Sequence, residues 1–166
     1  MSLFSKKSKP KQPEKPKFDT RIDSNDNLYP LLGKRGHDDL ESVINDFDEV
    51  TRCYREFNFV CGPDFETKKG KKKLEQGREN FGAMGAGKNY FVAACTVLGN
   101  YKRGFLIAED GFYFLDNDGA PGYYSWERYD ATTIKHSYTE IRIDDHQFLT
   151  AEAEMLGSLL ESLQNK

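Results

Sequence analysis

The chain has 166 residues, of which 37% are hydrophobic, and a formal net charge of -3. This length suits one domain of ordinary size with appendages, because a single core is commonly built from about 100 to 150 residues. Residues 1–21 hold six lysines and one arginine against two acidic residues, a net charge of +5, so the remainder carries -8. An acidic body lacks the clustered cationic face that phosphate binding needs, and we expect no nucleic-acid partner.

The cysteines and the hydropathy pattern predict a cytoplasmic protein. Cys53, Cys61 and Cys95 are odd in number and share no repeated spacing. Without a metal-ligand spacing or a secretory signal, we expect free thiols, no metal site and no cofactor. The sequence has no apolar run near the roughly 20 residues that span a bilayer.

The first 27 residues are predicted to be a disordered basic tail. "SKKSKPKQPEKPK" contains three prolines and many lysines but no large apolar residue. Such a segment cannot bury enough surface to offset its ordering entropy. Leu3 and Phe4 stand before the lysine run, where they could touch an anionic membrane surface. Because two apolar residues are a thin anchor, membrane binding is an alternative hypothesis and not the leading one.

Residues 28–86 are predicted to be a helical segment. From Asp38 onward, apolar side chains recur at intervals of three and four, which predicts an amphipathic helix. Asp46, Asp48 and Glu49 are expected on the opposite face, where they could attract a basic partner, although a solvated face is the commoner explanation. The apolar stripe consists of Leu40, Val43, Ile44, Phe47, Val50, Tyr54 and Phe57.

A second helix is expected over residues 71–80. The stretch "NFGAMGAGKNYF" then matches most of a phosphate loop, with Gly82, Gly87 and Lys88 at the required spacing. Asn89 replaces the hydroxyl residue that binds magnesium, and the following sequence predicts a strand instead of a helix. Nucleotide binding at Gly82 to Lys88 is therefore a second alternative. The only basic cluster of the predicted body precedes this stretch: Lys68, Lys69, Lys71, Lys72 and Lys73.

Beyond Gly87 the sequence is typical of short strands. Apolar, β-branched and aromatic runs alternate with turn dipeptides, among them Asp110-Gly111 and Asp118-Gly119. A C-terminal amphipathic helix is predicted to begin at Thr150 as its N-cap. Seven strands are predicted before it, over residues 90–98, 103–108, 111–116, 122–126, 129–135, 138–143 and 146–149.

This order resembles that of a pleckstrin-homology (PH) domain. "KRGFLIAEDGFYFLDNDGAPGYYSWERY" is similar to the hairpin region of bacterial PH-like domains, and "IRIDDHQFLTAEAEMLGSLLESLQ" is similar to their end. The resemblance covers about residues 90–164. It implies an α+β fold in which an antiparallel seven-stranded PH-like barrel or sandwich, residues 87–166, is capped by the C-terminal helix and preceded by the helical segment. It also implies a non-catalytic module that binds protein, peptide or sometimes lipid headgroups.

The leading hypothesis is a protein–protein interaction module, such as an adaptor, an inhibitor or an immunity-type binder, and not an enzyme. The expected contact surfaces are an exposed strand edge and the acidic helix from Asp38 to Phe57. The headgroup alternative depends on Lys102 and Arg103, in the loop between the first two predicted strands. Trp126, the only tryptophan, is a further candidate contact, although a tryptophan is more often part of a core.

Overall fold

The computed structural model describes residues 34–51, 58–96 and 99–166. Within these ranges the protein is α+β, with a five-stranded antiparallel sheet, a three-stranded sheet and a C-terminal helix. The predicted tail, residues 1–27, lies outside the described residues. The end of the predicted acidic helix, residues 52–57, lies outside them as well.

The five-stranded sheet follows the order of the sequence, and every neighbouring pair is antiparallel. The turns predicted at Asp110-Gly111 and Asp118-Gly119 are confirmed, since they connect β3 to β4 and β4 to β5. Gly119 has a φ of +81°, a left-handed conformation that glycine adopts without strain. The strands are β1 (Phe59–Cys61), β2 (Asn89–Ala94), β3 (Gly104–Ala108), β4 (Gly111–Leu115) and β5 (Pro121–Ser125).

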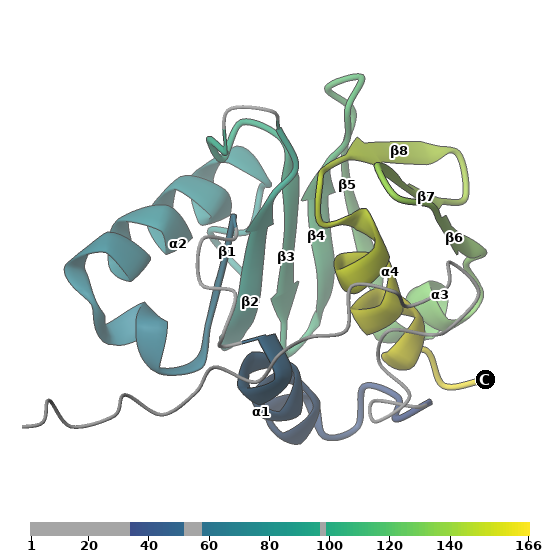
Figure 1. Cartoon of the computed structure of the whole chain (residues 1–166), viewed down its shortest axis with the longest axis horizontal. Helices are drawn as coiled ribbons and strands as arrows, with labels where there is room; N and C mark the ends of the chain where they lie inside the picture. Colours follow the sequence, from purple (N-terminus) through teal and green to yellow (C-terminus); the bar gives the residue numbers. More distant parts are fainter. Residues whose placement is uncertain (1–33, 52–57, 97–98) are drawn as a thin grey trace, which may run out of the picture.

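The smaller sheet is a meander of β6 (Ile134–His136), β7 (Glu140–Ile143) and β8 (His146–Leu149). Helix α4 (Ala153–Ser162) follows it and packs against β6 and β7. Figure 1 shows α4 and the smaller sheet on one side of the five-stranded sheet, with α2 on the other side. The two sheets are separate within the described residues, so the predicted seven-stranded barrel is not closed.

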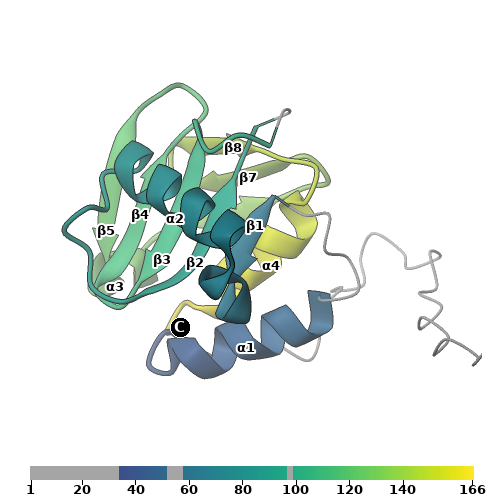
Figure 2. The ribbon, with the colours of Figure 1, turned by 90° about the vertical axis from the view of Figure 1, so that its left-hand side faces the viewer.

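Two apolar cores lie on the two faces of the five-stranded sheet. The inner core joins the sheet to α4 and the smaller sheet, and contains a chain of contacting rings that includes Phe91, Phe105, Phe112 and Phe148. The outer core lies beneath helix α2 (Lys68–Asn80), which packs against β1, β2 and β3 (Figure 2). Burial of these faces is the main stabilising contribution to the fold.

Helix α1 (Leu40–Thr51) belongs to the same body. The predicted stripe is confirmed where it is described, because Leu40, Val43, Ile44 and Phe47 are all buried. The ring centroid of Phe47 lies 5.5 Å from that of Phe59 and 5.6 Å from that of Phe91. The inner core therefore includes α1.

Two sequence-based expectations about the elements are wrong. Residues 28–86 are not only helical, because they contain β1 and the 3-10 helix η2 (Gly62–Glu66) in addition to α1 and α2. The predicted strand at 129–135 begins as helix α3 (Trp126–Asp130), and β6 takes only its end. The described part of residues 87–166 holds the seven strands that were predicted there, and β1 is an additional strand outside that range.

The local reasons for α3 are clear from its contacts. The Ser125 hydroxyl caps the helix by accepting a hydrogen bond from the Arg128 N–H at 3.4 Å. Tyr129 is fully buried, and its hydroxyl donates to the Leu160 carbonyl in α4 at 2.6 Å. The prediction of Thr150 as the N-cap of the C-terminal helix is also wrong, because the N-cap residue of α4 is Glu152.

Candidate functional site

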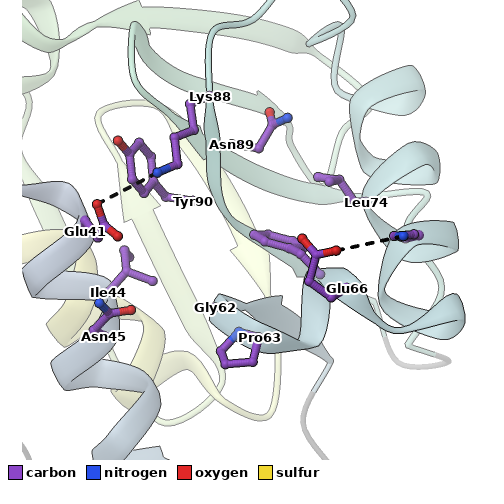
Figure 3. A pocket seen from close by; sticks show the side chains of 12 residues that line it. Glu41, Ile44, Asn45, Gly62, Pro63, Glu66, Leu74, Lys88, Asn89 and Tyr90 are labelled. Atoms are coloured by element: carbon purple, nitrogen blue, oxygen red, sulfur yellow. Dashed lines mark ion pairs between the residues drawn. The ribbon is translucent and has the colours of Figure 1, made fainter.

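A groove of about 560 Å³ lies between α1 and α2 (Figure 3). Its walls come from α1, from the consecutive elements η2 and α2, and from the start of β2 with the residue before it. Its volume is within the range of about 300–1,000 Å³ that is typical of binding pockets. The lining residues are Glu41, Ile44, Asn45, Gly62, Pro63, Phe65, Glu66, Lys71, Leu74, Lys88, Asn89 and Tyr90.

The apolar lining of the groove connects the two cores. Ile44 belongs to the inner core, and the half-buried Tyr90 packs against that core. Phe65 and Leu74, both half-buried, pack against the outer core. Because these four side chains are anchored in the cores, the apolar part of the groove is held in place by the fold itself.

The two ends of the groove carry exposed ion pairs. At one end, Lys88 Nζ lies 3.8 Å from Glu41 Oε2 and 5.0 Å from the centre of the Tyr90 ring. At the other end, Lys71 Nζ lies 3.9 Å from Glu66 Oε2, and Figure 3 shows the two pairs on opposite sides of the groove. All four charged side chains are at least 59% exposed. Exposed ion pairs contribute about 0–1 kcal/mol to stability, so these side chains can exchange their present partners for charges of a bound protein at little cost in free energy.

Lys88 therefore has a structural position different from that of a phosphate-loop lysine. The segment from Gly82 to Lys88 follows α2 and leads directly into strand β2, as the sequence pattern predicts, and not into a helix. The Gly87 N–H donates to Asp110 Oδ1 at 2.9 Å, so this amide is already occupied. Partial burial opposes ionisation of Asp110, but hydrogen bonds from Tyr113 and Gly87 outweigh it and hold the pKa below its ordinary value.

The three predicted acidic contacts of α1 do not form one surface. Asp46 forms an ion pair with Arg35 at 2.5 Å, and Glu49 is exposed. The expectation that Asp48 lies on the solvent face is wrong, because it is only 6% exposed and its Oδ1 lies 3.6 Å from Cys61 Sγ. Asp48 follows Ile44 by one helical turn, which places it beside the apolar stripe.

The two predicted headgroup contacts lie in the loop between β2 and β3. Lys102 is exposed, whereas Arg103 is half-buried. The Arg103 guanidinium donates to the Lys102 carbonyl at 2.8 Å and lies beside Gly119 of the β4–β5 turn. The Arg103 side chain thus already has local partners.

The Trp126 side chain is held by contacts with other residues of the same chain. Its ring stacks on His37 at a centroid distance of 4.8 Å and meets Tyr129 edge-on. Its indole N–H donates to the Glu109 carbonyl at 2.9 Å. Because one ring face is covered by His37 and the N–H is bonded, Trp126 links the start of the described chain to the β3–β4 turn.

The free edge of the sheet at β5 contains a proline that disfavours the addition of a further strand. The Asp116 N–H donates to the Ala120 carbonyl at 3.0 Å, so in this register Pro121 and Tyr123 turn their backbone groups away from β4. Proline has no N–H to offer, and an outward proline is a common protection against strand addition. The α1–α2 groove is therefore a better contact surface than this edge.

Two histidines lie close to carboxylates of other elements. His146 Nδ1 lies 2.6 Å from Asp116 Oδ2 and so connects β8 to the β4–β5 turn. His136 lies between Glu154 and Glu161 of α4, at 3.6 and 3.4 Å. In the described ranges no group of three or more His, Cys, Asp or Glu side chains is placed to hold a metal ion.

The sequence did not reveal the groove itself. Phe65, Leu74 and Tyr90 are not close in the chain, and each has the sequence surroundings of an ordinary core residue.

None of the helices formed by the described residues is long and apolar enough to cross a membrane. Comparisons of the chain with protein-family models, curated proteins and solved structures found no match.

Proposed function

We propose that the protein is a non-catalytic binding module that holds a segment of a partner protein in the α1–α2 groove. The observation that carries this proposal is an anchored apolar lining placed between two exposed ion pairs. Apolar surface supplies the free energy of binding, and charged rims give orientation and rate. A partner segment with an apolar side chain flanked by residues of both charges fits this arrangement.

We further propose that β2 to β8 and α4 form a PH-like unit, with α1, β1 and α2 added to it. The order supports this assignment: four strands in one meander, three strands in a second, and then a helix that packs on the second sheet. In this arrangement the groove is built where the added elements meet the first strand of the unit. Analogy of fold leaves the partner open, so the proposal depends on the groove and not on the fold.

Site-specific photo-crosslinking in cells tests the proposal. One chain carries a photoreactive amino acid in place of Asn45, which is exposed and lines the groove. The matched control carries it in place of Asn117, which is exposed in the β4–β5 turn. We expect a discrete protein adduct from position 45 and none from position 117.

Competition then shows whether the adduct comes from the groove. Excess wild-type chain and an Asn117→Trp variant should suppress the adduct, whereas an Asn45→Trp variant, with an indole in the groove, should not. Equal adducts from both positions, or equal competition by both tryptophan variants, would refute binding in the groove. Failure to obtain any adduct from position 45 would count against the proposal in the same way.

A further inference from the structure

A second surface lies on the outer face of β4 and β5, beyond the strands against which α2 packs. Tyr113 and Tyr123 are direct partners in the β4–β5 register, with ring centroids 4.6 Å apart, and Leu115 pairs with Pro121 in the same way. Tyr123 is 43% exposed, Pro121 is exposed, and the other two side chains are half-buried. We call these four residues the tyrosine ledge.

The tyrosine rings of the ledge are held in fixed positions. The Tyr113 hydroxyl donates to the Asp110 carboxylate, and the Tyr123 hydroxyl donates to the Asp110 carbonyl at 2.7 Å. Tyr123 also lies over Gly111, where an added Cβ would come within 2.7 Å of its ring. With their hydroxyls bonded to the β3–β4 turn, the rings offer their faces as a preorganised contact surface.

The sequence of this same chain contains a segment of matching chemistry. In "SKPKQPEKPK", residues 8–17, the prolines Pro10, Pro13 and Pro16 occur at every third position. A polyproline II helix has three residues per turn, so the three prolines would share one face. Fixed aromatic surfaces are the usual receptors for such helices.

The charge and the length of residues 8–17 also match those of the tyrosine ledge. Residues 8–17 contain four lysines and one glutamate, a net charge of +3. Exposed carboxylates lie at both ends of the ledge: Glu109 and Asp110 at the β3–β4 turn, and Asp118 at the β4–β5 turn. Five residues of strand extend about 17 Å, and the six steps from Pro10 to Pro16 extend about 19 Å as polyproline II.

The described chain also begins close to the ledge. His37 stacks on Trp126, and Trp126 donates to the Glu109 carbonyl beside Asp110. The 17 steps from Lys17 to Lys34 can span up to about 55 Å, so residues 8–17 can reach the ledge within the same molecule. A tether of this kind gives an effective concentration of about 1 mM.

We propose that residues 8–17 bind the tyrosine ledge of their own chain as a polyproline II helix. The prolines contact Tyr113 and Tyr123, and the lysines face the carboxylates at the two ends. At this effective concentration, a contact with a Kd of about 1 mM would be docked in about half of the molecules. This inference goes beyond the proposed function, because it concerns a surface separate from the groove.

Paramagnetic relaxation in the full-length chain tests the proposal. A nitroxide is attached through Ser8→Cys, with Cys53→Ser present; Cys61 and Cys95 are buried and do not compete for the label. We expect broadening of the amide signals of residues 113–123 that does not change on tenfold dilution. Replacing all three prolines by alanine, which keeps every charge, should remove most of it.

Matched tyrosine variants locate the contact. Tyr123→Ala should reduce the broadening, while Tyr138→Ala, which changes a tyrosine that is 64% exposed in the β6–β7 loop, should not. Broadening that persists in the proline-free chain would overturn the proposal, since charge alone would then explain it. Absence of broadening at the ledge, its appearance at the groove instead, or its loss on dilution, which would indicate a second copy or another partner, would each overturn it too.

Discussion

The attachment of α1 to the body is tested by truncating Phe47. This side chain is 0% exposed and contacts the rings of Phe59 and Phe91. Replacing a buried phenylalanine by alanine costs about 3–5 kcal/mol, because the transfer free energy is lost and a cavity remains. We expect the free energy of unfolding to fall by this amount for Phe47→Ala. Since α1 forms one wall of the groove, partner capture should fall with it.

Urea unfolding followed by circular dichroism measures the change. A domain of this kind has a total stability of about 5–15 kcal/mol, so Phe47→Ala removes a large share of it. The milder Phe47→Leu, which should cost about 1–2 kcal/mol, keeps a measurable folded baseline. Both variants should unfold in one cooperative transition, because Phe47 belongs to the same core as the sheet. Glu49→Ala, an exposed change on the same helix, is the control and should alter stability by less than about 0.5 kcal/mol.

Two results would refute this reasoning. A loss below about 1 kcal/mol for Phe47→Ala would mean that its site is not a packed core position. A separate, earlier transition for the helix would mean that α1 does not share the cooperative unit of the sheet. In either case the groove would have no fixed second wall.

Three further predictions concern other contacts of the fold. Tyr129→Phe removes a buried hydroxyl that donates to α4, and urea unfolding should show a loss of about 1–2 kcal/mol. Gly77→Ala should lower the melting temperature although alanine favours helices, because its Cβ would lie 2.4 Å from a β2 side chain; Gly85→Ala, in open space, should leave it unchanged. Burial opposes ionisation of Asp116, but the His146 bond outweighs it and lowers the pKa. The stability that the carboxylate adds is therefore complete above its unfolded pKa of about 3.9 and is lost as pH falls through the lower folded value. The deficit of Asp116→Asn that urea unfolding shows at pH 7 should therefore shrink as the pH is lowered below about 3.9.

The elements with a clear period or a specific turn residue were predictable from the sequence. The apolar stripe of α1 has the interval of three and four along its whole length, and the acidic-glycine dipeptides define the hairpins from β3 to β5. The strand β1 was not predictable, since three residues are too few to show alternation. Helix α3 was missed because Tyr129 and the run 132–134, two threonines and an isoleucine, favour strands locally. The Ser125 cap and the bond from Tyr129 to α4 favour a helix in the folded protein.

The candidate site was less predictable than the fold. Binding by Asp48 was expected from its predicted place on the polar face of the helix, and binding by Trp126 from its residue type. The structure places both side chains in contacts within the protein. The groove depends on side chains from four elements whose proximity is created only by folding. The 3-10 helix η2, which the sequence did not reveal, supplies one of its walls.

The described chain joins its first residues to its last. The backbone N–H groups of Arg35 and Gly36 donate to the Ser162 carbonyl at 2.9 and 2.8 Å, and Asn165 lies 3.0 Å from His37 across 128 residues of sequence. On the ribosome, α1 is synthesised long before these partners leave the exit tunnel. The first helix of the described residues is thus among the last elements to be secured, and until then its apolar stripe is exposed to chaperones.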